Sequence, residues 1–101
     1  MVIALGTLRG NPFGDASRAF FRLMGRCLTQ ALGQPLRVRA PLSGLSKAQV
    51  LRSATGVRLD FTFSCLRPQG RRHCGRCQKC GERRAAFRLA HKPDPTTYAT
   101  R

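Results

Sequence analysis

The chain has 101 residues, which is the size of one domain. Its 19 lysine and arginine residues outnumber 4 acidic ones, and the resulting formal net charge of +15 favours polyanions such as nucleotides or nucleic acid. Apolar residues make up 42% of the chain, which argues against disorder, and no apolar run approaches the roughly 20 residues of a membrane-spanning helix.

The first part of the chain predicts a strand, a helix and a second strand. Residues 2–8 are a short apolar run and favour a buried strand. The helix is expected to be capped by the carboxylate of Asp15 and to stop at Gly33. Cys27 lies in its apolar stripe and is interpreted as a core residue. Apolar and basic residues alternate over 35–41, which predicts the second strand. The expected apolar stripe consists of Ala16, Phe20, Leu23, Met24, Cys27, Leu28 and Ala31.

The second part predicts two shorter helices on either side of an extended segment. A capping box at residues 46–49 opens a helix expected over 47–55. Residues 59–65 alternate between apolar and polar side chains, as in an extended segment with one apolar face. The last helix is expected over 81–90. The order strand, helix, strand, helix favours a parallel α/β layer that carries a metal-binding appendage.

Cysteine gives the sharpest chemical signal. Four of the five cysteines are spaced nine, three and three residues apart: Cys65, Cys74, Cys77 and Cys80. Four thiolates suit a closed tetrahedral zinc site, and a site with no open position predicts a structural rather than a catalytic metal. An iron–sulfur cluster and a redox or disulfide use are the alternatives. His73 is expected to lie beside this site rather than to replace a ligand.

Basic residues surround the cysteines in the sequence. Part of this charge neutralises the thiolates, and the rest either binds phosphate groups or forms a solvated face. The residues concerned are Arg67, Arg71, Arg72, Arg76, Lys79, Arg83, Arg84, Arg88 and Lys92.

Several motifs in this order resemble the C-terminal half of the 7-cyano-7-deazaguanine synthases, the QueC/ExsB family. They are Ser64-Cys65, His73-Cys74-Gly75-x-Cys77-x-x-Cys80, Arg83-Arg84-x-Ala86-Phe87 and Asp94-Pro95-Thr96-x-Tyr98. Residues 10–16 and 40–48 are also similar to the family, so the resemblance covers about residues 6–98.

The resemblance implies a partial Rossmann-like layer of the adenine nucleotide α-hydrolase type with a C-terminal four-cysteine zinc-binding appendage. Members of the family use ATP and ammonia to convert 7-carboxy-7-deazaguanine to the nitrile preQ0 for queuosine biosynthesis. The family's ATP-binding signature, Ser-Gly-Gly-x-Asp-Ser, is absent from this sequence. ATP is therefore expected only where a partner supplies that loop, the partner being an N-terminal-half chain or a second copy.

Three residues are candidate substrate contacts, and each has a plainer alternative. Lys47 could contact a phosphate or carboxylate, or it is a surface lysine. Asp15 could recognise the deazaguanine N–H groups, or it only caps a helix. Ser64 could line a substrate pocket, or it is a hydroxyl on an exposed face. No catalytic base is identified.

Taken together, the sequence predicts one domain over 1–101, divided into an α/β half-domain (1–63), a zinc-binding loop and helix (64–92) and a tail (93–101). Its predicted function is that of a zinc-binding module of a QueC-like ATP-dependent synthase, inactive without its partner; whether the chain alone is an enzyme is left open. The alternative is a non-catalytic, zinc-stabilised basic module that binds nucleic acid. No secretory signal or membrane span is visible, so a cytoplasmic location is expected.

Overall fold

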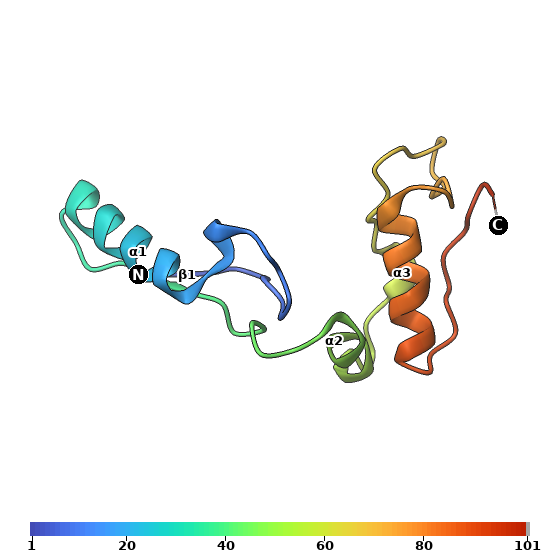
Figure 1. The fold of residues 1–101 in the computed structure, drawn as a ribbon, viewed down its shortest axis with the longest axis horizontal. Coiled ribbons are helices and arrows are strands. Elements are labelled where there is room, and N and C mark those ends of the chain that lie inside the picture. The colour runs from blue at the N-terminus through green and yellow to red at the C-terminus, as the bar shows by residue number, and fades with distance from the viewer. Residues whose placement is uncertain (101) are drawn as a thin grey trace. The chain divides into compact units, whose positions relative to one another are not determined.

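The structure is a computed structural model that describes residues 1–100 (Figure 1). Its contacts divide the chain into two compact units, Met1–Ser46 and Lys47–Arg101. None of the helices in the described residues is both long enough and apolar enough to cross a membrane. The predicted organisation as a single domain stays a prediction.

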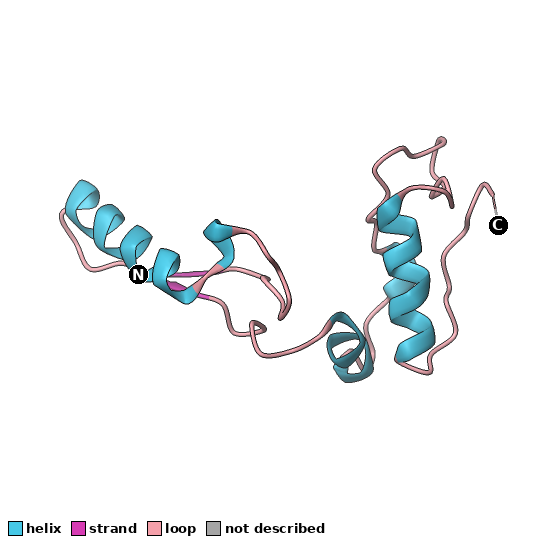
Figure 2. Ribbon diagram, viewed as in Figure 1, coloured by secondary structure: helices cyan, strands magenta, loops and turns pink. Residues whose placement is uncertain are grey.

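The first unit is built around two short parallel strands, drawn in magenta in Figure 2. Strand β1 (Val2–Ala4) pairs with β2 (Arg37–Arg39) in a register that places Ile3 opposite Val38. The helix α1 (Arg18–Leu32) connects the two strands and packs on β2. A strand–helix–strand unit with parallel strands is the arrangement that the sequence predicts, so the α/β class is confirmed.

Helix α1 approaches β2 closely through small and hydrogen-bonding side chains. Phe21 is buried, and a side chain on Gly25 would lie 3.3 Å from the carbonyl oxygen of Leu36. The hydroxyl of Thr29 donates to that oxygen (3.2 Å) and accepts from the Leu36 N–H (2.9 Å). One side chain thus satisfies both backbone groups of the residue that leads into β2.

The start of α1 differs from the prediction, whereas its end agrees with it. Asp15 lies in a short 3-10 helix, η1 (Gly14–Ala16), and is not the cap of α1. Ser17 takes that role because its backbone is extended and its hydroxyl accepts from the Phe20 N–H at 3.0 Å. Gly33 ends the helix with a φ of 70°, a left-handed conformation that glycine adopts without strain.

Apolar burial in the first unit is lower than predicted. Val2 and Ile3 in β1 are exposed, so the expected buried strand is wrong in burial and, at three residues, shorter than expected. Cys27 is also exposed rather than in the core. The reason is that α1 turns Phe21, Gly25 and Thr29 toward β2, and none of the seven residues of the predicted apolar stripe is buried. The unit therefore presents uncovered apolar surface.

The second unit consists of α2 (Lys47–Ser53), the 3-10 helix η2 (Leu59–Phe61) and α3 (Gln78–Leu89). Helices α2 and α3 pack together around a small apolar core of Ala48, Ala86, Phe87 and Ala90. Helix α2 ends at Ser53, two residues before its predicted end. Two larger expectations need correction here. The residues 59–61 are helical rather than extended, and α3 begins at 78 rather than 81.

Both corrections have local causes. Just before η2, the Arg58 guanidinium pairs with Asp60 at 2.6 Å and lies 4.2 Å from the Phe61 ring centroid, and both contacts favour a tight turn over an extended segment. Helix α3 starts early because the sulfur of Cys77 acts as its cap and accepts from the Cys80 N–H at 3.4 Å.

The Thr29 contact predicts a local effect of removing its hydroxyl. In Thr29→Val the Leu36 N–H loses its partner, so its hydrogen exchange should accelerate by about five- to tenfold, the equivalent of roughly 1 kcal/mol. Thr29→Ser keeps the hydroxyl and should retain most of the protection. Amide exchange measured by NMR checks this, and equal protection in the two variants would contradict it.

Candidate metal centre

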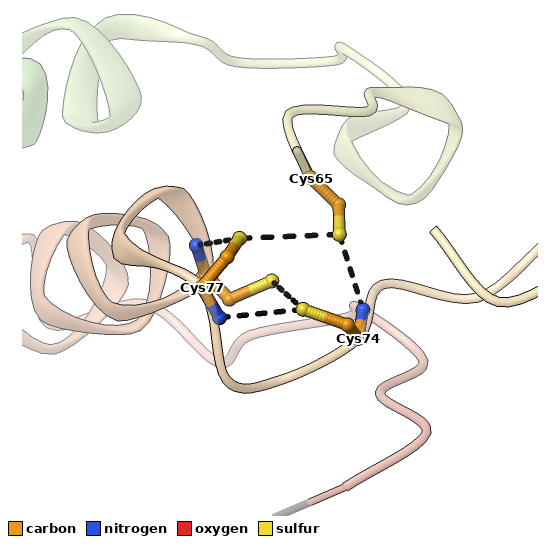
Figure 3. A group of neighbouring side chains, drawn as sticks. Cys65, Cys74 and Cys77 are labelled. Atoms are coloured by element: carbon orange, nitrogen blue, oxygen red, sulfur yellow. Dashed lines mark hydrogen bonds between the residues drawn. The ribbon is translucent and has the colours of Figure 1, made fainter. Parts of the chain in front are cut away.

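The sulfur atoms of Cys65, Cys74, Cys77 and Cys80 converge in the second unit. All four lie within 4.8 Å of one another, with Cys74 and Cys80 3.9 Å apart and Cys77 and Cys65 4.0 Å apart at their sulfur atoms. Figure 3 shows the labelled side chains of Cys65, Cys74 and Cys77 pointing toward a common centre. The predicted grouping of four cysteines is confirmed.

These separations fit a single tetrahedral ion. Four sulfurs at about 2.3 Å from a central Zn²⁺ would be about 3.8 Å apart. A disulfide needs a sulfur–sulfur distance of about 2.05 Å, and all five cysteines are free thiols in the structure. The cluster therefore has the donor atoms, number and spacing to hold one metal ion with no ligand position left open.

Each ligand comes from a different kind of backbone. Cys65 follows η2 in an irregular segment, Cys74 opens a tight turn, and Cys77 caps α3. Cys80 lies in the first turn of α3, and its side chain is fully buried. A metal held by this set would join a loop, a turn and a helix into one body.

Backbone N–H groups close to the cysteines donate to their sulfur atoms. Six of them donate at 3.2–3.4 Å, from Arg67, Cys74, Gly75, Arg76, Cys77 and Cys80. Donors of this kind stabilise a thiolate more than a thiol. The backbone around the cysteines thus stabilises negatively charged sulfur even without a metal ion.

The pKa values of the cysteines differ, and Cys80 is the one whose thiolate needs a nearby positive charge. The backbone N–H of Leu66 is the main cause that lowers the pKa of Cys77 to about 6. The N–H of Arg76 likewise lowers the pKa of Cys74. Burial acts in the opposite direction and raises the pKa of Cys80 to about 12. Cys80 would therefore ionise at neutral pH only beside a cation, which compensates the cost of a buried thiolate.

Gly75 has to be glycine for two reasons. Its φ of 81° is left-handed, and a side chain on it would collide with the carbonyl oxygen of Thr100. The guanidinium of Arg84 donates to the carbonyl oxygens of both residues, at 2.8 Å each, and lies 4.0 Å from the Tyr98 ring centroid. The cysteine turn is therefore clamped to α3 and to the C-terminal segment.

His73 is buried next to Cys74 and is not one of the four grouped ligands. Its ring packs 4.1 Å from that of Phe63, and its Nε2 accepts from the Ser64 N–H at 3.2 Å. Burial, more than the nearby Arg83, lowers the pKa of His73, in keeping with a neutral ring that accepts a hydrogen bond. The backbone of His73 pairs with residues 97 and 99, at 3.1 and 2.8 Å.

The C-terminal segment is ordered by Asp94. Its carboxylate accepts from the Thr96 N–H at 3.0 Å and from the Tyr98 hydroxyl at 2.7 Å. Burial, and then the Asp94 bond, raise the pKa of Tyr98 to about 12, so the phenol stays protonated as the donor. These contacts hold the segment beside His73.

The three predicted substrate contacts belong to both units. Lys47 and Ser64 line one small cavity in the second unit, together with Arg83. Asp15 is an exposed residue of the first unit. Contact of any of them with a substrate stays a prediction. Sequence reasoning placed Arg83 only among nine surrounding basic residues, and no periodic pattern marks it as buried.

Comparison with known proteins gives a consistent result. The family model described as "Queuosine biosynthesis protein QueC" matches residues 1–91. The chain is 51% identical over 104 aligned residues to the 7-cyano-7-deazaguanine synthase of Anaeromyxobacter dehalogenans strain 2CP-C, covering 96% of this chain and 44% of the relative. It is 39% identical over 88 residues to the synthase of the same name from Methanothermobacter thermautotrophicus, covering 85% of this chain and 39% of the relative.

The two alignments cover 96% and 85% of this chain. The chain nevertheless spans less than half the length of either relative. Such a match fits the C-terminal half that the sequence motifs resemble. No solved structure matches the chain.

The geometry at Gly75 predicts a large difference between two glycine substitutions. Gly75→Ala should destabilise the metal-loaded chain by at least about 2 kcal/mol, because the new methyl group is both strained and obstructed. Gly81→Ala places a methyl group with nothing within 4 Å on α3 and should be neutral or stabilise by up to about 1 kcal/mol.

Denaturant unfolding followed by circular dichroism, with a chelator competition for metal affinity, compares these two variants. A Gly75→Ala protein as stable and as tightly metal-bound as Gly81→Ala would show that the clamp between the turn and Thr100 is not needed.

Proposed function

This chain belongs to the QueC family, and we propose that it forms the C-terminal, zinc-binding part of an ATP-dependent synthase that converts 7-carboxy-7-deazaguanine to 7-cyano-7-deazaguanine. The observation that carries the proposal is the four-cysteine cluster, which lies inside the segment that matches the family. The relatives share that activity in their name, and the chain corresponds to 44% of the first of them.

Zinc is the metal that the donor set supports best. Four thiolates in a closed tetrahedron suit Zn²⁺, which needs no particular electronic geometry. A cluster of several iron atoms would hold its ligand sulfurs farther apart than a single ion does, whereas these four lie within 4.8 Å of one another. With no open ligand position, the metal would act on folding and not on the substrate.

The uncovered surface of the first unit supports a larger assembly. Large apolar side chains are exposed on β1 and α1, among them Val2, Leu23 and Leu32. The sheet has only two strands in the described residues, and each keeps one edge unpaired. We propose that the remaining part of the synthase covers this surface and brings the ATP-binding loop. Without that part, a second copy of the chain is the partner most able to hide the same surface.

The metal assignment predicts about one zinc per chain in freshly purified protein. Cys80→Ser should lose the metal and the ordered second unit, because structural zinc contributes on the order of 10 kcal/mol to folding. Cys27→Ser is the matched control, since it removes an exposed cysteine outside the cluster. Elemental analysis and circular dichroism measure both effects, and a metal-free wild-type chain that is fully folded would contradict the assignment.

The synthase assignment predicts activity in a chimera. Residues 1–101 would replace the matching segment of the Anaeromyxobacter dehalogenans relative, and product formation from 7-carboxy-7-deazaguanine, ammonia and ATP would be followed by chromatography. The chimera should turn over, and the same chimera with Cys80→Ser should not. A folded, zinc-loaded chimera without product would sink the proposed activity while leaving the metal centre intact.

A further inference from the structure

The first unit contains a groove of about 670 Å³ between helix α1 and strand β2. One wall is formed by α1 from Phe21 to Gln30, and the other by residues 36–39. A second hollow of about 400 Å³ shares Phe21 and Val38 with the groove and extends it to Arg18. No residue of β1 lines either hollow. The groove is therefore distinct from the exposed apolar surface on β1 and α1 that is described above.

The groove has an apolar floor and a positively charged rim. Phe21 and Leu36 are buried in the floor, and Val38 is half-buried beside them. No acidic residue of the described chain lines the groove, and none of the ion pairs within residues 1–100 involves its rim. Like charges around one apolar surface repel one another unless a negative partner lies between them. The rim consists of five exposed arginines, Arg18, Arg22, Arg26, Arg37 and Arg39.

The backbone at the groove favours a helix over an added strand as the occupant. The hydroxyl of Thr29 already binds both the N–H and the carbonyl oxygen of Leu36. Gly25 packs so closely on this edge of β2 that a side chain there would lie 3.3 Å from the same carbonyl oxygen. An added strand would have to break these contacts. The groove instead runs along residues 21–30 of α1, which is about 14 Å, or two to three turns of a second helix lying beside it.

The charge of the chain excludes a second copy as a suitable occupant. Only 4 of the 101 residues are acidic. Three of these, Asp60, Glu82 and Asp94, already accept hydrogen bonds within their own chain. A symmetric contact between two copies would also place the arginine rim against itself. A nucleic acid would neutralise the rim through its phosphates but would not cover the apolar floor. The groove requires a partner that is both acidic and apolar.

We propose that this groove binds an acidic amphipathic helix of a partner protein. Apolar side chains at helical spacing on one face of that helix would cover Phe21, Leu36 and Val38. Aspartate or glutamate side chains along its two flanks would pair with the arginines of the rim, which offer planar forked donors to carboxylates. The proposal goes beyond the synthase activity and does not rest on it, so the two can fail separately.

The test titrates the full zinc-loaded chain into a fluorescein-labelled helical peptide of about 14 residues, which is long enough to span the groove. The peptide carries leucine at i, i+3, i+4 and i+7 and glutamate elsewhere, and fluorescence anisotropy at about 0.15 M salt reports binding while diffuse attraction to the basic chain is screened. A scrambled peptide of the same composition lacks the apolar stripe. It should bind at least about tenfold more weakly, because it buries fewer leucines.

Two matched double variants test whether the rim is the site of binding. Arg22→Gln/Arg26→Gln removes two charges from the rim and should weaken the affinity by about tenfold. Arg52→Gln/Arg88→Gln removes two charges from exposed helical positions of the second unit and should change the affinity less than about twofold. All four positions are exposed, so both proteins should keep the circular dichroism spectrum of the unmodified chain.

The location and the class of the partner are measured in the same series. NMR shifts of the Gly25 and Val38 amides should accompany peptide binding, since both residues line the groove. An RNA oligonucleotide with the same number of negative charges serves as the competitor, and it should not displace the peptide. Equal binding of the scrambled peptide, or equal losses in the two double variants, would overturn the proposal. Displacement of the peptide by the RNA would assign the groove to nucleic acid and overturn it as well.

Discussion

The second unit depends on bringing four sulfur atoms to one point. Its apolar core is small, with alanines at three of its four positions and Phe87 as the one large side chain. Such a core cannot by itself offset the conformational entropy of more than fifty residues. A structural zinc site supplies on the order of 10–16 kcal/mol, as much as the whole net stability of an ordinary domain. The metal would therefore take the place that a larger hydrophobic core has elsewhere.

The cysteine ligands also position residues that bind no metal. Cys65 is adjacent to Ser64, and Cys80 lies three residues before Arg83 on the same helix. Fixing the two sulfurs in one site therefore fixes the cavity wall from both sides, since Arg83 and Ser64 are 3.4 Å apart at their nearest nitrogen and oxygen. Loss of the metal would therefore disturb the cavity, although none of the four cysteines lines it. The cysteine cluster and the cavity are thus linked through two short stretches of chain.

Features that depend on residues close together in the chain could be predicted from the sequence. Cysteine spacing identifies the ligands because few other roles suit four thiols at these intervals, and Gly33 marks the end of α1 because its backbone is left-handed. The predictions that failed depend on competition between neighbours. Ser17 and Asp15 are both suitable caps, and only the path of η1 decides between them. Arg83 was not predicted as buried, because its partners come from η2 and the C-terminal segment, far away in sequence.

Burial in the first unit was overestimated for a different physical reason. An amphipathic pattern shows that a helix face is suited to be covered, and it does not say which chain covers it. The stripe that contains Leu23 and Cys27 is apolar, yet within residues 1–100 only the face with Phe21 and Gly25 meets β2. An isolated soluble unit would gain nothing by keeping a second apolar face in contact with water. On the proposed function, the remaining part of the synthase would cover this second face, since the chain spans only 44% of the first relative.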